Sequence, residues 1–363
     1  MNKYLSIFFW VLITTANVSM SQTKEPPKQE REVWICYWDT STNLSGYKDL
    51  HGNIKIPTRF WYCSGVFNNI AAVFDSTSSY FLLKDGRVVG KDSVYSIAPS
   101  EGEMDGIESE GKIAFHDNKT DKVGFFDSTG KVIIPTTYDI AYPFHNGVTI
   151  VKKGGKRKQF DLEHRGFVGG KWILINYKNE TLIENWDDGN NQIDWYSMTT
   201  DKVADTANYI SVKGMNGTRY SFFCYNKEFE HWFYNVFLPI INTGNNDKIY
   251  NLLFPSVTAW TDHWVASPRA QFLKKYSPKL KSKFNHIPGK NIYILHEDPD
   301  PELSESPLFA HFYTPGGEAF KEHYPAFDVI QTYNKPDGSI HYQDNLEFIR
   351  TDDGYKLYRV SIR

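Results

Sequence analysis

The side chains that most often perform catalysis are scattered along this chain instead of gathered in motifs. None of the eleven histidines falls in H-E-x-x-H, which places two zinc ligands and a general base on one helix. The pattern G-x-S-x-G, which exposes a nucleophilic serine at a sharp turn, is also absent. His311 and His323 form the closest histidine pair in a region able to make a pocket, and surface or hydrogen-bonded roles are the simpler interpretation of both. The sequence predicts no zinc hydrolase and no serine hydrolase.

Carboxylates are frequent but lie in turns and loops. The run His296–Ser304 (HEDPDPELS) offers Asp298 and Asp300 to calcium, yet its prolines and its lack of a glycine hinge do not fit a calcium loop. Asp187-Asp188 and Asp352-Asp353 sit in turns, where aspartate bonds nearby backbone groups. We therefore predict no catalytic residue, no cofactor and no metal ligand, and we interpret the chain as a protein that is not an enzyme.

Aromatic side chains offer a binding function instead. A face of stacked rings would contact a sugar or a peptide, and at strand positions the same rings would be core. The candidates for a ligand or partner surface in the first half of the chain are Trp34, Trp38, Trp61, Tyr62 and Tyr142. A second set in the last third would line a small-ligand pocket or fill a core. Its members are Trp232, Phe233, Tyr250, Trp260, Trp264 and Phe348.

The stretch Gly124–Val151 shows which elements must position the first set. It reads as strand, turn and strand, followed by a second strand pair that Tyr138 opens and Val151 closes. The turn is Asp127 to Gly130, because aspartate bonds its own backbone and glycine accepts positive φ. Pro135 is expected to stop the β-branched run before it from pairing further.

The same pattern recurs along the chain, and repetition at a fixed period is typical of stacked architectures. In the stretch Gly46–Val73, Asp49 and Gly52 align with the turn residues Asp127 and Gly130, and Pro57 aligns with Pro135. A degenerate copy combines Tyr80–Val89 with Ser109–Ala114. In a fourth copy, Gly170–Ile183, Asn176 replaces the turn aspartate and Asn179 the glycine.

The shared pattern, G-[aromatic]-x-D-x-x-G-K-x-I-I-P-x-x-Y-D with a closing strand that starts F-x-x-G, resembles the WG-repeat proteins of bacteria. The Trp-Gly pair itself is replaced by Val123-Gly124 and Ser45-Gly46. Each unit is too small to bury a core alone, so units must stack. The sequence predicts a mainly β fold in which residues 32–185 form a WG-like array of stacked hairpins. Both an open stack and a closed propeller fit four units, and we favour the open stack.

The polar passage Trp186–Ser197 is interpreted as a domain junction. Beyond it, Asn226–Ile241 has the spacing of an amphipathic helix, and Pro268–Phe284 is expected to be interrupted by Pro278. Strands are predicted at Asn291–Leu295 and Leu308–Tyr313, and a hairpin is predicted around the turn at residues 351–354. Residues 198–363 thus predict a smaller α+β domain with an antiparallel sheet. They resemble an uncharacterised family of exported domains that is similar to the cone-shaped nuclear-transport-factor-2-like fold.

The N-terminus predicts export. Lys3 and the apolar run Leu5–Ile13 precede small residues, so residues 1–21 read as a cleavable signal and residues 22–31 as a flexible leader. The apolar run is too short to span a bilayer, so no integral membrane segment is expected after cleavage. A net charge of -3 gives no reason to expect nucleic acid. We expect a periplasmic or extracellular protein.

Three cysteines remain after cleavage: Cys36, Cys63 and Cys224. Either Cys36 bridges Cys63, or all three are small buried hydrophobes. The preferred functional hypothesis is a non-catalytic binding or scaffolding protein of the bacterial cell envelope whose β-repeat surface contacts an unknown protein or glycan. The alternative is an enzyme or small-ligand binder with its pocket in the C-terminal domain. A convergence of His, Asp and Tyr in a concave pocket would favour that alternative.

Overall fold

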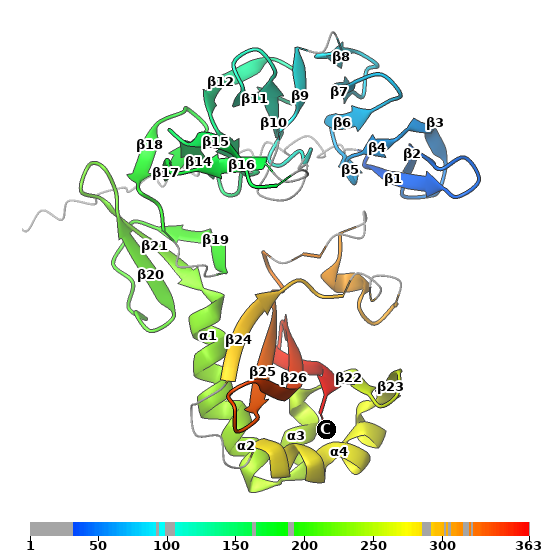
Figure 1. Ribbon diagram of the computed structural model, residues 1–363, viewed down its shortest axis with the longest axis vertical. Helices are drawn as coiled ribbons and strands as arrows, with labels where there is room; N and C mark the ends of the chain where they lie inside the picture. Colours follow the sequence, from blue (N-terminus) through cyan, green and yellow to red (C-terminus); the bar gives the residue numbers. More distant parts are fainter. Residues whose placement is uncertain are drawn as a thin grey trace, which may run out of the picture. The chain divides into compact units, whose positions relative to one another are not determined.

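The computed structural model describes residues 32–91, 94–98, 106–161, 165–187, 192–284, 292–300, 303, 306–314, 319–320 and 322–362 (Figure 1). The predicted signal and leader lie outside these residues. Val33–Arg363 form one compact unit. Among the described residues, no helix is long and apolar enough to cross a membrane.

The first part of this unit consists of four antiparallel sheets of four strands each (Figure 1). The first has the order β3-β2-β1-β5, with β1 Trp34–Asp39, β2 Leu44–Asp49, β3 Ile54–Phe60 and β5 Val66–Phe67. The second has the order β4-β6-β7-β8, with β4 Tyr62–Cys63, β6 Ile70–Phe74, β7 Ser79–Leu83 and β8 Val88–Val89. The third has the order β12-β11-β10-β9, with β9 Tyr95–Ile97, β10 Lys112–Asp117, β11 Lys122–Asp127 and β12 Val132–Tyr138. The fourth has the order β13-β14-β17-β18, with β13 Ile140–Ala141, β14 Val148–Lys153, β17 Lys171–Asn176 and β18 Thr181–Glu184.

Each sheet ends in one of the predicted repeat hairpins, β2/β3, β7/β8, β11/β12 and β17/β18. An additional hairpin, β15 Lys156–Gln159 and β16 Arg165–Val168, lies between β14 and β17 in the sequence. The turn residues behave as the sequence predicts. Gly52, Gly130 and Asn179 all have positive φ, at 87°, 81° and 65°. In three of the turns one side-chain oxygen accepts two backbone N–H groups: Asp49 Oδ1 from His51 and Asn53, Asp127 Oδ1 from Thr129 and Lys131, and Asn176 Oδ1 from Lys178 and Glu180.

Pro135 does not end its strand, contrary to the prediction. β12 continues through it to Tyr138, because the pairing with β11 shifts register between Phe125↔Ile134 and Val123↔Tyr138. The resulting bulge accommodates a residue without an N–H donor. It also brings the Ile134 carbonyl oxygen to within 2.5 Å of the position that a Cβ on Gly124 would occupy. Gly46 has the same relation to the Ile56 carbonyl, so the repeat glycine is required sterically.

Gly124→Ala is therefore expected to lower the free energy of unfolding by about 2 kcal/mol, since a backbone oxygen must move to admit the methyl group. Gly52→Ala is the matched comparison. Alanine at this position must adopt the positive φ of Gly52, but no atom lies within 4 Å of the added carbon. Its expected cost is about 1 kcal/mol. Urea unfolding of both variants measures the difference, and an equal loss in the two would contradict the steric argument.

Hydrophobic clusters lie between consecutive sheets and hold the array together. One cluster joins the first sheet to the second through residues such as Tyr47 and Leu82. The next joins the second sheet to the third through Phe81 and Phe115. A third joins the third sheet to the fourth through Phe125 and Ile173. Each of these clusters contacts only neighbouring sheets, and among the described residues none joins the first sheet to the fourth. The stacked-hairpin array of the prediction is confirmed, and its clusters are those of an open stack.

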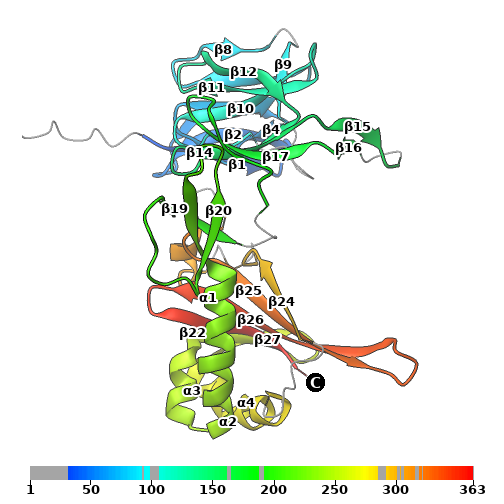
Figure 2. The same ribbon diagram turned by 90° about the vertical axis from the view of Figure 1, so that its left-hand side faces the viewer.

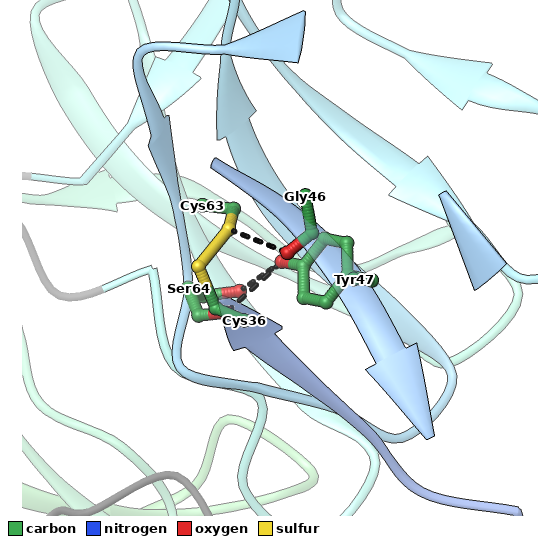
Figure 3. The surroundings of a disulfide bond; sticks show 5 residues. All are labelled: Cys36, Gly46, Tyr47, Cys63 and Ser64. Atoms are coloured by element: carbon green, nitrogen blue, oxygen red, sulfur yellow. Dashed lines mark hydrogen bonds between the residues drawn. A yellow bond between two sulfur atoms is a disulfide. The ribbon is translucent and has the colours of Figure 1, made fainter. Parts of the chain in front are cut away.

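A disulfide joins the first sheet to the second. Cys36 on β1 and Cys63 on β4 are bonded, with a sequence separation of 27, so the disulfide alternative for this pair is the correct one (Figure 3). The buried Tyr47 hydroxyl donates to the Ser64 carbonyl oxygen at 3.0 Å beside it. Cys224 is free and buried.

The polar passage Trp186–Ser197, predicted as a junction, contains a strand. β19 Ile193–Thr199, β20 Tyr209–Lys213 and β21 Arg219–Cys224 form a sheet of the order β19-β21-β20. Trp186, Ile193 and Phe222 are buried in one cluster with Leu174 and Ile183 of the fourth sheet, so this sheet extends the stack. β21 then runs directly into the first helix at Tyr225.

The C-terminal part is an α+β structure, as predicted (Figure 2). Its helical elements are α1 Tyr225–Trp232, the π-helical turn η1 Phe233–Phe237, α2 Leu238–Thr243, α3 Asn246–Leu252 and α4 Arg269–Phe284. Its sheet has the order β23-β22-β27-β26-β25-β24, with β22 Leu253–Trp260, β23 Trp264–Pro268, β24 Ile292–Glu297, β25 Ala326–Asn334, β26 Ile340–Thr351 and β27 Gly354–Ser361. All neighbours are antiparallel except β22 and β27. The helices bury Phe229, Phe237 and Phe272 against this sheet.

Two local predictions in this part are wrong. α4 is not interrupted at Pro278, because Phe272, Leu280 and Phe284 on either side of it are buried in the core and hold the helix. Leu308–Tyr313 is not a strand but a turn and the short 3₁₀ helix η3, Ala310–Phe312. Its apolar residues pack on Phe254 and Tyr358. Pro239 is accommodated at the start of α2 after η1.

Candidate functional site

A cavity of about 540 Å³ lies where the β19–β21 sheet meets the first helix and the β26/β27 hairpin. Polar and aromatic side chains converge on it from five separate stretches of chain. The lining residues are Asp194, Ser197, Tyr209, Phe223, Tyr225, His323, Tyr324, Arg350 and Asp352. This volume is within the usual range for a small-molecule site. The convergence of His, Asp and Tyr that favours the alternative, an enzyme or small-ligand binder, is therefore present, although the cavity is shared between the β19–β21 sheet and the C-terminal part.

The fold positions these residues from both sides. Asp194 and Ser197 project from β19, Tyr209 begins β20 and Phe223 lies on β21. The Ser197 hydroxyl accepts the Phe223 N–H at 2.7 Å and donates to the Asp194 carbonyl oxygen at 2.6 Å. The first of these bonds connects β19 to β21 where their backbone pairing is irregular, and the second lies within β19.

Arg350 on β26 is held by an ion pair. Its Nε donates to Glu228 Oε2 at 2.9 Å and its second nitrogen to Oε1 at 3.4 Å. The buried Tyr355 hydroxyl donates to Glu228 Oε2 at 2.8 Å. Burial lowers the pKa of Arg350, but the hydrogen bond and the charge of Glu228 outweigh it and raise the pKa overall. Glu228 therefore neutralises the arginine at the cavity wall.

Tyr225 begins α1 and is buried at the base of the cavity. Its hydroxyl donates to the Glu322 carbonyl oxygen at 3.1 Å, and the Arg350 guanidinium lies 5.1 Å from its ring centroid. Burial, followed by the negative charge of Asp194, raises the pKa of Tyr225 far above its usual value. This phenol stays protonated throughout the physiological range.

Tyr324, Asp352 and His323 also line the cavity, and His311 contacts Tyr324 from outside the lining. The Tyr324 hydroxyl lies 2.6 Å from His311 Nε2 and donates to Asp352 Oδ1 at 3.2 Å. Burial and the charge of Asp352 raise the pKa of Tyr324. His323 is exposed and stacks on Tyr196 at a centroid distance of 5.9 Å.

Among the described residues, none of the ring contacts joins two of the aromatic residues predicted for the first half of the chain. Trp38 and Trp61 are each 60% exposed, and Trp61 packs edge-on against Phe74. Trp34 and Tyr62 are half-buried against two different clusters. Tyr142 contacts Trp172 at a centroid distance of 5.7 Å.

The second predicted set does not line the cavity. Phe233 and Phe348 are fully buried in the core of the α+β part, and Trp232 packs on them. Tyr250 is half-buried under the guanidinium of Arg269. Trp260 and Trp264 are exposed and contact each other across the β22/β23 hairpin at 5.1 Å.

The described part of the acidic segment that begins at His296 makes contacts that stabilise the fold. Asp300 accepts Arg359 at 2.8 Å, and its carbonyl oxygen accepts the Tyr313 hydroxyl. Among the described residues, no group of histidines, cysteines and carboxylates is arranged to hold a metal ion.

Comparison with known proteins identifies one repeat. Residues 124–156 match the model of the WG containing repeat. The resemblance to WG repeats is confirmed for the unit that contains Gly124–Val151. No curated protein is similar enough in sequence to be matched with this chain.

Two solved structures are similar to part of the chain. One, named Rd1NTF2_05 and carrying five substitutions, has 14% identity and a TM-score of 0.22, covering 38% of this chain and 99% of its own. The other is a domain from Xanthomonas campestris assigned as a calcium/calmodulin dependent protein kinase II association domain. It has 12% identity and a TM-score of 0.21, covering 38% of this chain and 87% of its own. Scores of this size carry no argument about fold or function.

Proposed function

We propose that this chain is a non-catalytic binding protein of the bacterial cell envelope, with the β19–β26 cavity as its ligand site and the β-repeat array as its scaffold. The single observation that carries the proposal is the cavity, where the buried Tyr225, three half-buried aromatic rings and charged side chains converge on a volume suited to a small ligand. The groups at its wall are engaged: Arg350 is paired with Glu228, and Tyr225 stays protonated. This arrangement favours binding over acid–base chemistry.

Export is part of the same proposal. The predicted signal at residues 1–21 supports it, and so does the Cys36–Cys63 disulfide, because such bonds persist in oxidising compartments. Determination of the N-terminal residue of the protein recovered from the envelope fraction tests this part. Cleavage before Gln22 is expected, and an intact Met1 in the cytoplasmic fraction would contradict it.

A thermal-shift screen of the purified protein tests the binding function. Amines, carboxylates, sugars and short peptides are the ligand classes, and at least one is expected to raise the melting temperature. Asp352→Trp places a large ring in the exposed turn at the cavity mouth and is expected to abolish the shift. Asp353→Trp, at the next turn position and outside the lining, is the matched control. A screen without any shift, or shifts that survive Asp352→Trp, would refute the cavity as the ligand site.

A second candidate function is favoured by the two exposed tryptophans. Trp38 and Trp61 leave most of their rings in solvent, which suits contact between the repeat array and an unknown protein or glycan. The double variant Trp38→Ala/Trp61→Ala is expected to reduce retention on immobilised envelope glycan or envelope protein. Tyr177→Ala, an exposed aromatic of the fourth repeat, is the control. Unchanged retention of the double variant would exclude this surface.

A further inference from the structure

The walls of the cavity form an aromatic corner. The Tyr209 and Phe223 rings lie 5.5 Å apart at 85°, and the Phe223 and Tyr225 rings lie 5.5 Å apart at 77°. Consecutive rings at nearly right angles present both faces and edges to the same space. Ring faces carry negative and ring edges positive electrostatic potential, so the corner attracts a positive group at its ring faces.

The charges around this corner have the complementary sign. Asp194 lines one side, on β19, and Asp352 lines the other, in the hairpin turn. Among the ion pairs of the described residues, Asp194 has no lysine or arginine partner, and it accepts the Tyr196 backbone N–H at 2.9 Å. Asp352 accepts the Tyr324 hydroxyl, and His311 lies 3.9 Å from its other oxygen. A carboxylate offers about four acceptor positions, so both groups retain acceptor capacity, although Asp194 also interacts with the Tyr225 hydroxyl and 81% of the Asp352 side chain is exposed.

The one arginine of the lining does not offset them. Arg350 is engaged by both oxygens of Glu228, so an anionic ligand would have to compete with a bidentate ion pair. Its position also shows what the corner accepts, because its guanidinium already rests 5.1 Å from the Tyr225 centroid. Lys227 is directed to the Tyr209 carbonyl oxygen at 3.0 Å and is not part of the lining.

We propose that the cavity binds an organic cation, with a primary or quaternary ammonium group seated between the Tyr209–Phe223–Tyr225 corner and the carboxylates of Asp194 and Asp352. This inference rests on the proposed binding function and names the ligand class of that site. The ammonium group belongs either to a small free amine or to a lysine side chain of a peptide, since both present the same chemistry.

Isothermal titration calorimetry on the purified protein tests the ligand class. The probes are choline, 3,3-dimethyl-1-butanol as its uncharged isostere, propylamine, acetate and a short peptide with one lysine. Choline or propylamine is expected to bind at least about tenfold more tightly than the uncharged isostere. Binding of the peptide alone assigns the cation to a lysine side chain, and binding of the free amines assigns it to a small molecule. Both results support the site.

Amide variants locate the charge. Asp194→Asn and Asp352→Asn preserve an acceptor for the turn hydrogen bonds and remove the negative charge, and each is expected to weaken cation binding about fivefold to tenfold. Asp353→Asn removes a charge from the same hairpin outside the lining and is expected to leave binding within about twofold. Phe223→Leu keeps an apolar side chain without a ring face and is expected to weaken quaternary ammonium more than propylamine. Melting temperatures of all variants establish that they are folded.

The outcomes separate this inference from the proposed function. Equal affinity for choline and its uncharged isostere, or binding of acetate alone, would overturn the cation assignment and leave the cavity as a ligand site. Cation binding that Asp194→Asn and Asp352→Asn leave unchanged would overturn the assignment of these residues. Failure of every probe and of the whole thermal-shift screen would refute both.

Discussion

Replacing Glu228 by alanine is expected to lower the free energy of unfolding by about 3 kcal/mol, the largest loss we predict for a single residue near the cavity. Glu228 lies in the first turn of α1 and joins that helix to β26 and β27 through Arg350 and Tyr355. Without the carboxylate, the Arg350 charge is left at a largely buried site, with 29% of its side chain exposed, and the Tyr355 hydroxyl loses its shortest hydrogen bond. Removing one member of such a pair costs more than the pair contributes.

Urea unfolding monitored by circular dichroism measures this loss. Glu230→Ala is the matched control, because Glu230 is exposed on the same helix, and its expected effect is within about 0.5 kcal/mol. Glu228→Ala/Arg350→Met removes both charges and is expected to recover part of the stability. Similar losses for Glu228→Ala and Glu230→Ala would show that the ion pair does not stabilise the junction of α1 and the sheet.

A second substitution at the same position, Glu228→Gln, links stability to ligand choice. Glu228 does not line the cavity, yet it neutralises the one arginine that does. In Glu228→Gln the Arg350 charge is no longer balanced, so the cavity becomes less favourable to a cation without losing any lining residue. Under the proposed cation assignment, ligand choice thus depends on a residue outside the lining.

The repeat hairpins were predictable because their information is local. Turn residues three positions apart fix both the φ values and the side-chain bonds, and even the substituted turn of the fourth copy follows, with Asn179 at a φ of 65°. The bulge at Pro135 was missed because it depends on how Gly124 admits the Ile134 carbonyl across the strand pair. That relation is not visible in either strand alone.

The cavity could not be predicted for a similar reason. Its residues lie between positions 194 and 352, and each has an ordinary local explanation. Asp352, for example, reads as a turn residue and is one, while its role at the cavity follows only from where the β26/β27 hairpin is placed. Likewise, Leu308–Tyr313 has the composition of a strand but finds its partners in Phe254 and Tyr358 as a turn and short helix. None of the aromatic residues predicted from the sequence lines this cavity, and the aromatic surface in the first half of the chain stays a prediction.

A second large effect is expected from the pair of carboxylates that face each other across β25 and β26, Asp328 and Glu347. Asp328 Oδ1 is buried and has no hydrogen-bond partner among the described residues. Burial, followed by the negative charges of Glu347 and Glu297, raises the pKa of Asp328 to about 7. Burial also raises the pKa of Glu347, although Arg359 and Tyr358 oppose the shift.

The sign of the pH dependence follows from this shift. The folded protein binds the Asp328 proton more tightly than the unfolded chain, where the ordinary value is 3.8. The contribution of proton binding by Asp328 to the free energy of unfolding is therefore complete below about pH 4 and is lost as the pH rises through about 7. The shift corresponds to roughly 4 kcal/mol, and partial solvent screening reduces the expected loss to on the order of 3 kcal/mol between about pH 4 and about pH 8.

Asp328→Asn is expected to remove this loss, because the amide is uncharged and can donate to the Glu347 carboxylate opposite it. The variant should be more stable than the natural chain at about pH 8 and similar to it at about pH 4, since the natural Asp328 is protonated there. Asp262→Asn, in the exposed loop between β22 and β23, should follow the natural chain at both pH values. Unfolding free energies at several pH values decide the question. A natural chain whose stability relative to Asp328→Asn does not change with pH would show that the carboxyl group is ionised in the folded protein at little cost. The face of the sheet that carries Asp328 and Glu347 would then be more hydrated than the burial of Oδ1 indicates.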